Sequence, residues 1–219
     1  MSGLRVIAID GAAGAGKSTL ARGLARLLGV PYVNTGTMYR ALTWQALETD
    51  TDLDDGNGLA SLMQGLRFGL STGPSSELEV EGDAPSPELE TERVEAAVSR
   101  VARHPQVREL MRQIQRELGR PDAVVEGRDI GTVVFPDAAV KLFLTAAPET
   151  RVGRRAEERD AGDPDVSRAL RERDSLDARV NPFEPAPGAL VLDTSHRTVE
   201  ETLDVARSFV LERLPKATR

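Results

Sequence analysis

Short apolar runs alternate with segments of helical periodicity along this 219-residue chain. The runs predict buried strands, because a parallel sheet covered on both faces needs strands that are apolar along most of their length. They lie at 4–9, 31–36, 122–127, 138–146 and 188–195. Strands that alternate with helices indicate an α/β fold with a doubly wound, mainly parallel sheet.

Apolar positions spaced three and four residues apart predict the helices between these strands. In the first of them, Leu20, Leu24, Leu27 and Leu28 share one face, and Gly29 ends the helix. The predicted helices cover 17–28, 36–48, 59–66, 94–101, 107–118, 148–160, 164–175 and 198–213.

The stretch from 66 to 90 differs from its surroundings in residue composition and pattern. LRFGLS and ELEVEG read as two strands joined by TGPSS and followed by DAPSP. Proline, glycine and serine at the joints are typical turn residues, so this stretch predicts a small β insertion on the main domain. We find no internal repeat.

Composition allows one sizeable core and excludes several kinds of chemistry. Apolar residues make up 40% of the chain but aromatics only 4%, so the core must be built mainly from Leu, Val and Ala. No apolar stretch approaches the roughly 18 residues that would span a bilayer, and the N-terminus does not resemble a signal peptide. The absence of cysteine excludes disulfides, thiolate metal sites and a Cys nucleophile. We therefore expect a cytoplasmic protein without a membrane partner.

The charge distribution is acidic overall and basic in places. A net charge of −7 argues against a general nucleic-acid binder. Arginines nevertheless cluster at 151–159 and 168–174. Guanidinium groups grip phosphate in two places at once, so these clusters favour a small anionic ligand. The alternative is a pair of solvated helices with alternating charges.

The segment GAAGAGKS fits the phosphate-binding (P-loop) pattern G-x-x-x-x-G-K-[ST] and lies between a predicted strand and a predicted helix. Its glycines permit backbone angles that let successive amides form an anion nest, and the helix N-terminus adds a positive potential. We expect Lys17 to bridge the β- and γ-phosphates of ATP and the Ser18 hydroxyl to bind Mg²⁺. The predicted nucleotide-binding residues are Gly11, Ala12, Ala13, Gly14, Ala15, Gly16, Lys17, Ser18 and Thr19.

The loop alone does not identify the phosphate acceptor. The guanine-reading motif N-K-x-D of GTPases is absent, and motor or transporter ATPases are normally larger, which leaves a small kinase. Three further clusters are candidates for the acceptor site: NTGTMYR at 34–40, EGRDIGTVVFPDA at 126–138 and RERDSLDAR at 171–179. Each alone has a plain structural reading, such as a helix cap or an exposed ion pair. The second follows a strand, where ligands bind in parallel sheets.

Together these clusters give the chain a resemblance to a known family. T-G-x-x-Y-R, S-x-V-A-x-x-P-x-V-R, E-G-R-D-I-G-T-V-V-F-P-D-A and R-x-R-D-x-x-D resemble the motifs of bacterial cytidylate (CMP) kinases, over essentially the whole chain. The resemblance implies transfer of the γ-phosphoryl group of ATP to CMP or dCMP with Mg²⁺. It also implies a three-layer P-loop core at about 1–34, 104–150 and 186–219, an NMP-binding insertion at 35–103 and a helical lid at 151–175.

The resemblance also assigns roles to single residues. It implies that the acceptor α-phosphate is held by Thr35, Arg40 and Arg128, and the cytosine by Ser99, Arg108 and Asp129. It places Arg173 and Asp177 at the ribose, and Arg154 and Arg155 on a lid that closes over the transferring group. The implied catalytic residues are Lys17, Arg128, Arg154 and Arg155.

The proposed base-reading trio has a chemical rationale of its own. Cytosine offers an amino donor at C4 and acceptors at N3 and O2. Asp129 would accept from the amino group, and Arg108 would donate to the ring. Uracil would instead turn an acceptor toward the carboxylate, and an unpaired buried polar contact costs about 1–3 kcal/mol.

Three positions depart from the family pattern. Asn34 and Glu126 stand where aspartates are frequent, and Val180 stands where a last phosphate-binding arginine is usual, so that role is assigned to Arg179. Two alternatives stay open: a broader UMP/CMP kinase, and a P-loop regulatory protein that binds nucleotide without transferring phosphate. No surface patch suggests a protein partner, and we expect a monomer.

Overall fold

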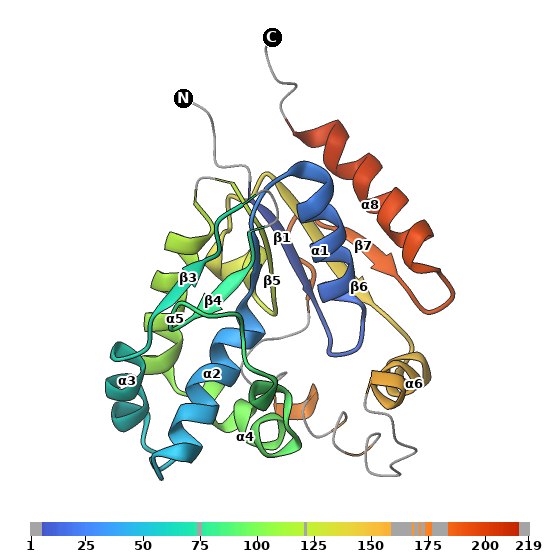
Figure 1. Cartoon of the computed structure of the whole chain (residues 1–219). Helices are drawn as coiled ribbons and strands as arrows, with labels where there is room; N and C mark the ends of the chain where they lie inside the picture. The colour runs from blue at the N-terminus through green and yellow to red at the C-terminus, as the bar shows by residue number, and fades with distance from the viewer. Residues whose placement is uncertain are drawn as a thin grey trace.

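The structure is a computed structural model that describes residues 6–73, 76–120, 122–158, 168, 171, 174–176 and 184–214. Its centre is a five-stranded sheet with the order β2-β5-β1-β6-β7, in which every neighbouring pair is parallel (Figure 1). The strands are β1 (Ile7–Gly11), β2 (Tyr32–Asn34), β5 (Val124–Gly127), β6 (Val140–Thr145) and β7 (Leu190–Asp193). All five predicted core strands are confirmed.

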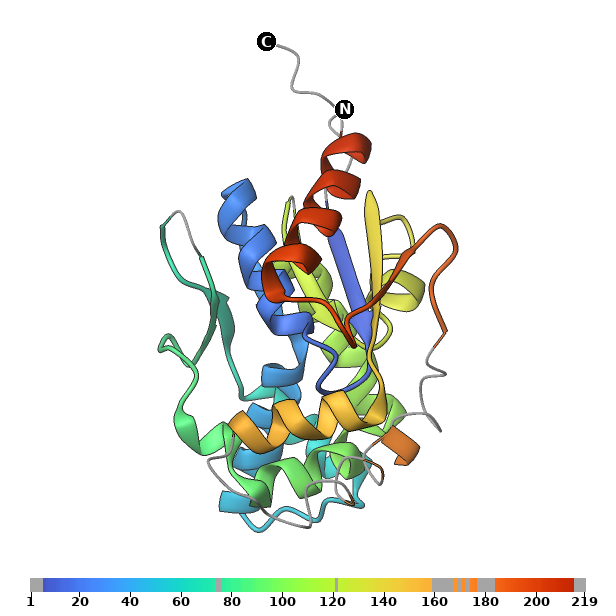
Figure 2. The same cartoon turned by 90° about the vertical axis from the view of Figure 1, so that its right-hand side faces the viewer.

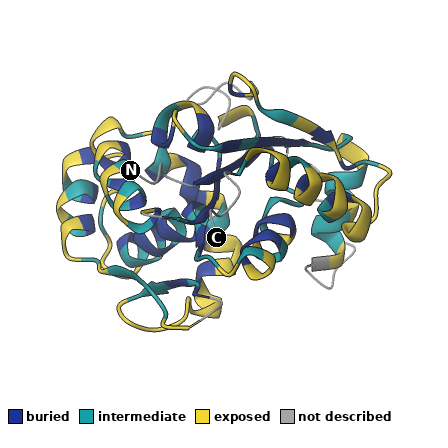
Figure 3. Ribbon diagram, turned by 90° about the horizontal axis from the view of Figure 1, so that it is seen from above, coloured by how far each residue is buried: buried dark blue, intermediate teal, exposed yellow. Residues whose placement is uncertain are grey.

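Helices cover both faces of this sheet, which explains why its strands are apolar throughout. In β1, Ile7 and Ile9 pack on one side with α1 (Lys17–Leu28) and α8 (Val199–Arg213). Val6 and Ala8 pack on the other side, where α2 (Thr35–Glu48), α3 (Gly56–Gln64) and α5 (Pro105–Leu118) close the second core. Figure 3 shows the buried residues gathered in these two layers around the sheet. Alternate residues of a strand point to opposite faces, so each strand serves both cores.

The helix ends follow local chemistry that the sequence carries. Gly29 closes α1 at φ 64°, a left-handed conformation that glycine adopts without strain. Asn34 caps α2 by accepting from the Thr37 amide at 3.2 Å. The departure from aspartate at this position therefore preserves the helix geometry. Asp55 caps α3, which explains why that helix starts before the predicted residue 59.

The predicted β insertion is a two-stranded antiparallel sheet formed by β3 (Phe68–Leu70) and β4 (Leu78–Val80). A 3₁₀ turn, η1 (Pro87–Glu90), and α4 (Glu92–Ala102) follow it. Beyond β5 the chain forms a single π-helical turn, η2 (Ile130–Val134), which the sequence analysis did not predict. Single π turns are frequently associated with functional sites.

The arginine-rich helix α6 (Pro148–Glu158) lies beyond the carboxyl ends of the strands, on the same side of the molecule as α4 (Figure 2). It confirms most of the helix predicted at 148–160. The helix predicted at 164–175 falls largely outside the described residues. Within the part of the chain that the structure describes, no helix is long and apolar enough to cross a bilayer.

Candidate active site

A cavity of about 320 Å³ opens at the carboxyl ends of the strands, between the P-loop, α2, α4, α5 and α6. Thirteen of the predicted site residues line it: Ala13, Gly14, Gly16, Lys17, Ser18, Thr19, Thr35, Arg40, Ser99, Arg108, Arg128, Asp129 and Arg155. Gly11, Ala12, Ala15 and Arg154 do not line it. The predicted ribose and phosphate residues Arg173, Asp177 and Arg179 lie outside the described residues.

The P-loop adopts backbone angles that require its glycines. Gly11, Gly14 and Gly16 have φ values of 147°, 73° and 89°. A Cβ at Gly11 would stand 2.2 Å from the carbonyl oxygen of Leu144, and one at Gly14 would stand 3.1 Å from the backbone of Arg151. Lys17 Nζ donates to the Ala12 carbonyl at 2.8 Å, which folds its side chain back along the loop. The ammonium group therefore lies at the nest and in the cavity wall.

A tyrosine joins the P-loop to the end of β5. The Tyr32 hydroxyl donates to the buried Glu126 carboxylate and is also hydrogen-bonded to Ser18. Burial, together with the Glu126 charge, raises the pKa of Tyr32 above its ordinary value, so the phenol remains a donor. The result is a hydroxyl and a carboxylate held close together by one phenol at the cavity wall. Oxygen ligands of this kind suit Mg²⁺, which is usually held by one or two protein groups plus phosphates.

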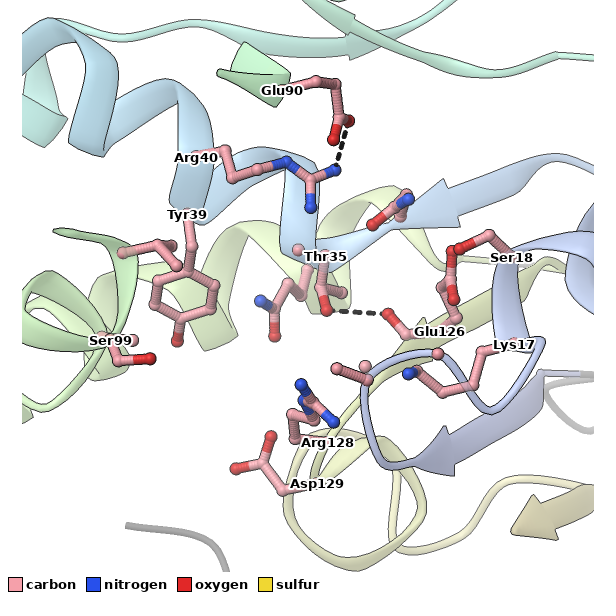
Figure 4. A pocket seen from close by; sticks show the side chains of 18 of the residues that line it. Lys17, Ser18, Thr35, Tyr39, Arg40, Glu90, Ser99, Glu126, Arg128 and Asp129 are labelled. Atoms are coloured by element: carbon pink, nitrogen blue, oxygen red, sulfur yellow. Dashed lines mark hydrogen bonds and ion pairs between the residues drawn. The ribbon is translucent and has the colours of Figure 1, made fainter. Parts of the chain in front are cut away.

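The three residues predicted for the acceptor phosphate each make a contact within the protein. Thr35 Oγ1 donates to the Glu126 carbonyl at 2.7 Å (Figure 4). Arg40 Nη2 lies 2.8 Å from the Glu90 carboxylate, and Arg128 Nη1 donates to the Gly11 carbonyl at 2.8 Å. Two guanidinium groups are thus anchored at the cavity. Guanidinium groups form strong, often bidentate hydrogen bonds with phosphate.

The predicted base-reading residues meet at the far end of the cavity. Arg108 Nη2 donates to Asp129 Oδ2 at 2.8 Å, and both side chains are largely buried. Ser99 faces them from α4, and the ring of Tyr39 lies beside it (Figure 4). Arg112 Nη2 stands 3.6 Å from the same carboxylate oxygen. The sequence analysis included Tyr39 in the cluster at 34–40 without assigning it a role, and it did not single out Arg112.

Arginines of α6 approach the P-loop in two different ways. Arg155 lines the cavity and lies 4.0 Å from Glu95 of α4. Arg154 points to the outside of the loop, where it donates to the Gly14 carbonyl at 3.3 Å and to the Thr194 carbonyl at 2.7 Å. Arg151, which the sequence analysis did not single out, donates to the Ala13 carbonyl at 3.3 Å and pairs with Asp174.

An anion nest at the carboxyl end of the central strand of a parallel sheet, facing several guanidinium groups across one cavity, is typical of the class of P-loop kinases. The Cytidylate kinase family model matches residues 7–210. The chain is 43% identical over 223 residues to a cytidylate kinase of Mycobacterium avium, covering 97% of this chain and 98% of that protein. It is 42% identical over 199 residues to one of Thermus thermophilus, covering 90% and 94%. The chain therefore belongs to the cytidylate kinase family.

A solved structure supports the fold. TT1252 from Thermus thermophilus superposes with a TM-score of 0.52 at 21% identity, covering 97% of this chain and 99% of that one. At this identity the similarity concerns the arrangement of the elements and not the reaction.

Proposed function

We propose that this protein transfers the γ-phosphoryl group of ATP to CMP or dCMP, giving ADP and CDP or dCDP. The observation that carries the proposal is that one cavity joins the P-loop to the Arg108–Asp129 pair. Membership of the cytidylate kinase family and the names of the relatives support the same reaction.

On the donor side, the nest formed by Gly11 to Thr19 would hold the ATP phosphates, with Lys17 between the β- and γ-groups. Ser18 and Glu126 would hold Mg²⁺, since Tyr32 brings their oxygens together. The bound ion would neutralise charge that builds up on the phosphate oxygens. Removal of Mg²⁺ with a chelator is expected to abolish transfer, and Ser18→Ala to raise the Mg²⁺ concentration that half-saturates the enzyme.

On the acceptor side, Thr35, Arg40 and Arg128 would bind the CMP phosphate and so hold the attacking oxygen near the donor. Ser99, Arg108 and Asp129 would bind the cytosine. The discrimination against uracil would come from the carboxylate, which accepts from the cytosine amino group and repels the uracil carbonyl. Arg173, Asp177 and Arg179 are proposed to complete the ribose and phosphate contacts.

Catalysis would rest on positioning and charge. The transition state of phosphoryl transfer spreads negative charge over the phosphoryl oxygens, so cations that face it lower the barrier without a strict need for a general base. Lys17, Arg128 and Arg155 line the cavity and are proposed for this role. Arg154 was predicted to share it, but its bonds to Gly14 and Thr194 support a role in holding the P-loop.

We further propose that the chain works as a core with two appended parts. The parts are the NMP-binding insertion at 35–103 and the lid at 151–175, which would close to exclude water from ATP. A cysteine-free chain and free nucleotides as substrates support a cytoplasmic location. We also propose a monomer. Light scattering of the purified protein tests the assembly.

The proposal is tested by following ADP release with ATP and Mg²⁺ in the presence of CMP, dCMP, UMP, AMP or no acceptor. We expect ADP release to depend on CMP or dCMP, with CDP or dCDP formed in equal amount. A non-catalytic nucleotide-binding protein would bind ATP and release no ADP with any acceptor.

A further inference from the structure

Asp10 is a buried carboxylate that the proposed reaction does not use. It stands on β1 directly before the first P-loop glycine, and only 5% of it is exposed. Its Oδ1 accepts from the Ile130 amide at 2.7 Å, and its Oδ2 accepts from the Gly131 amide at 2.8 Å. These amides belong to the turn that immediately follows Arg128 and Asp129.

A third hydrogen bond joins the same two strand ends, and here the side chain comes from the β5 side. Arg128, at the end of β5, donates from Nη1 to the carbonyl of Gly11, the residue after Asp10. The regular β1–β5 pairing ends at Asp10 opposite Gly127. Beyond that point the segments that follow β1 and β5 are joined by the side chains of Asp10 and Arg128. The start of the donor loop and the proposed acceptor-reading turn are therefore braced against each other.

The turn at 130–134 leaves room for the Asp10 carboxylate to approach its backbone. A Cβ on Gly131 would stand 3.3 Å from Asp10 Oδ2, tighter than ordinary van der Waals contact, so a glycine here lets the amide approach closely. Ile130 and Gly131 are the first two residues of η2, where backbone amides have no carbonyl partner within the helix, so both amides are available to one side chain.

Burial of the Asp10 charge costs stability. This cost indicates that the carboxylate has a role other than stabilising the fold. Burial raises the pKa of Asp10 to about 6, against the opposing effect of the two amide bonds. The nearby Asp129 charge raises the pKa further and Lys17 lowers it. At neutral pH the group is ionised, so both oxygens are free to accept. Costly buried charges are concentrated where geometry serves a site.

We propose that Asp10 is a positioning residue for the acceptor, which fixes Arg128 and Asp129 in the geometry that binds the CMP phosphate and reads its base. Asp10 touches neither substrate; it acts through the backbone of the turn. The inference rests on the proposed function and adds a specificity-determining residue to it.

The test compares Asp10→Asn and Asp10→Ser with Asp193→Asn as a control. Asp193 ends strand β7, two strands away from β1 in the sheet, and likewise accepts from a backbone amide, that of Ser195 at 2.9 Å, but it is exposed and does not line the cavity. Asparagine keeps one accepting oxygen and turns an N–H toward the second amide. Serine removes the charge and most of the bulk. Each protein is assayed for the KM of CMP, the CMP-to-UMP ratio of kcat/KM, and the equilibrium Kd of ATP.

We expect both Asp10 variants to raise the KM for CMP about tenfold or more and to lower the CMP-to-UMP ratio of kcat/KM. The reason is that Arg128 and Asp129 would no longer be held in position by the turn that Asp10 binds. The Kd for ATP should stay within about twofold, since the nest amides are not bonded to Asp10. The Asp193 control should match the wild type.

Several results would overturn the inference. They are an unchanged KM and base ratio in a folded variant, a loss of ATP affinity as large as the loss for CMP, and failure of both variants to fold. The last two would assign Asp10 to the P-loop or to the fold. Absence of CMP-dependent ADP release in the wild type would instead refute the proposed function, and this inference with it.

Discussion

Arg108 and Asp129, the residues proposed to bind the ring acceptors and the amino group of the cytosine, are bonded to each other at 2.8 Å across the end of the cavity. Arg108 lies on α5, and Asp129 lies 21 residues later in the chain, in the turn after β5. A base that enters this site would meet a donor and an acceptor already set side by side. The selectivity of the enzyme should therefore depend on the pair as a unit.

Asp129→Ala is expected to reduce kcat/KM for CMP about 10- to 100-fold and to reduce it much less for UMP, because the amino group of cytosine loses its acceptor. ATP affinity should hardly change. Asp137→Ala, an exposed change in the same segment, serves as the control. Steady-state kinetics and ATP titration measure these effects. A collapse of ATP binding with the base preference intact would show that Asp129 is structural.

Arg155→Met is expected to lower kcat far more than it raises either KM, because the guanidinium is proposed to act on charge that develops during transfer. A loss of about 10²-fold or more is expected if it faces the transferring group. Arg207→Met, on the exposed side of α8, gives the matched control. If kcat is unchanged in the Arg155 variant, that arginine only pairs with Glu95 and is not catalytic.

Arg154→Met should behave differently from its neighbour. It removes the hydrogen bonds that tie α6 to the Gly14 carbonyl and to Thr194, so the KM for ATP should rise while kcat with saturating ATP falls little. Thr194→Val removes the hydroxyl that Arg154 binds at 3.0 Å and should reproduce part of the effect. A large fall in kcat at saturating ATP would instead indicate that Arg154 is a catalytic residue, as the sequence analysis predicted.

The order of strands and helices could be predicted because it depends on local patterns. Apolar runs such as 138–146 fit only a covered strand, and glycine at 29 marks a helix end for steric reasons. The P-loop was recognisable because each of its residues has its own steric or chemical task. The π turn at 130–134 was not, since the Ile130 amide at its start donates to Asp10, a residue 120 positions away.

The site residues that the sequence analysis missed share this long-range character. Tyr32 lies in a short strand, and only the pairing of β2 with β5 brings its hydroxyl to Glu126. Arg112 reads as the polar face of a helix until α5 places it against Asp129. Arg154 and Arg155 are adjacent in the chain, yet one turns into the cavity and the other toward the outer side of the P-loop. Residue type alone does not distinguish them.

Asp10 should leave a signature in the pH dependence of stability. Its pKa is raised from 3.8 to about 6, so the folded state binds more protons than the unfolded state between these values. The contribution of Asp10 to the free energy of unfolding should therefore fall by about 3 kcal/mol as the pH rises through this range. Urea unfolding of the wild type and of Asp10→Asn from pH 4 to 7 measures the difference.

The control for this measurement again is Asp193→Asn. Hydrogen bonds from the hydroxyl and amide of Ser195 lower the pKa of Asp193, so its contribution to stability should have the opposite sign and be lost as the pH falls. A stability difference between wild type and Asp10→Asn that does not vary with pH would mean that folding does not raise the pKa of Asp10.

The central claim, that one cavity holds ATP and a cytosine monophosphate for phosphoryl transfer, is tested most directly by the ratio of kcat/KM for CMP to that for UMP. With ATP and Mg²⁺ saturating, we expect CMP to be favoured by tens- to hundreds-fold, the range available from one mismatched buried polar contact. Equal values for CMP and UMP, or no transfer to either, would contradict the account.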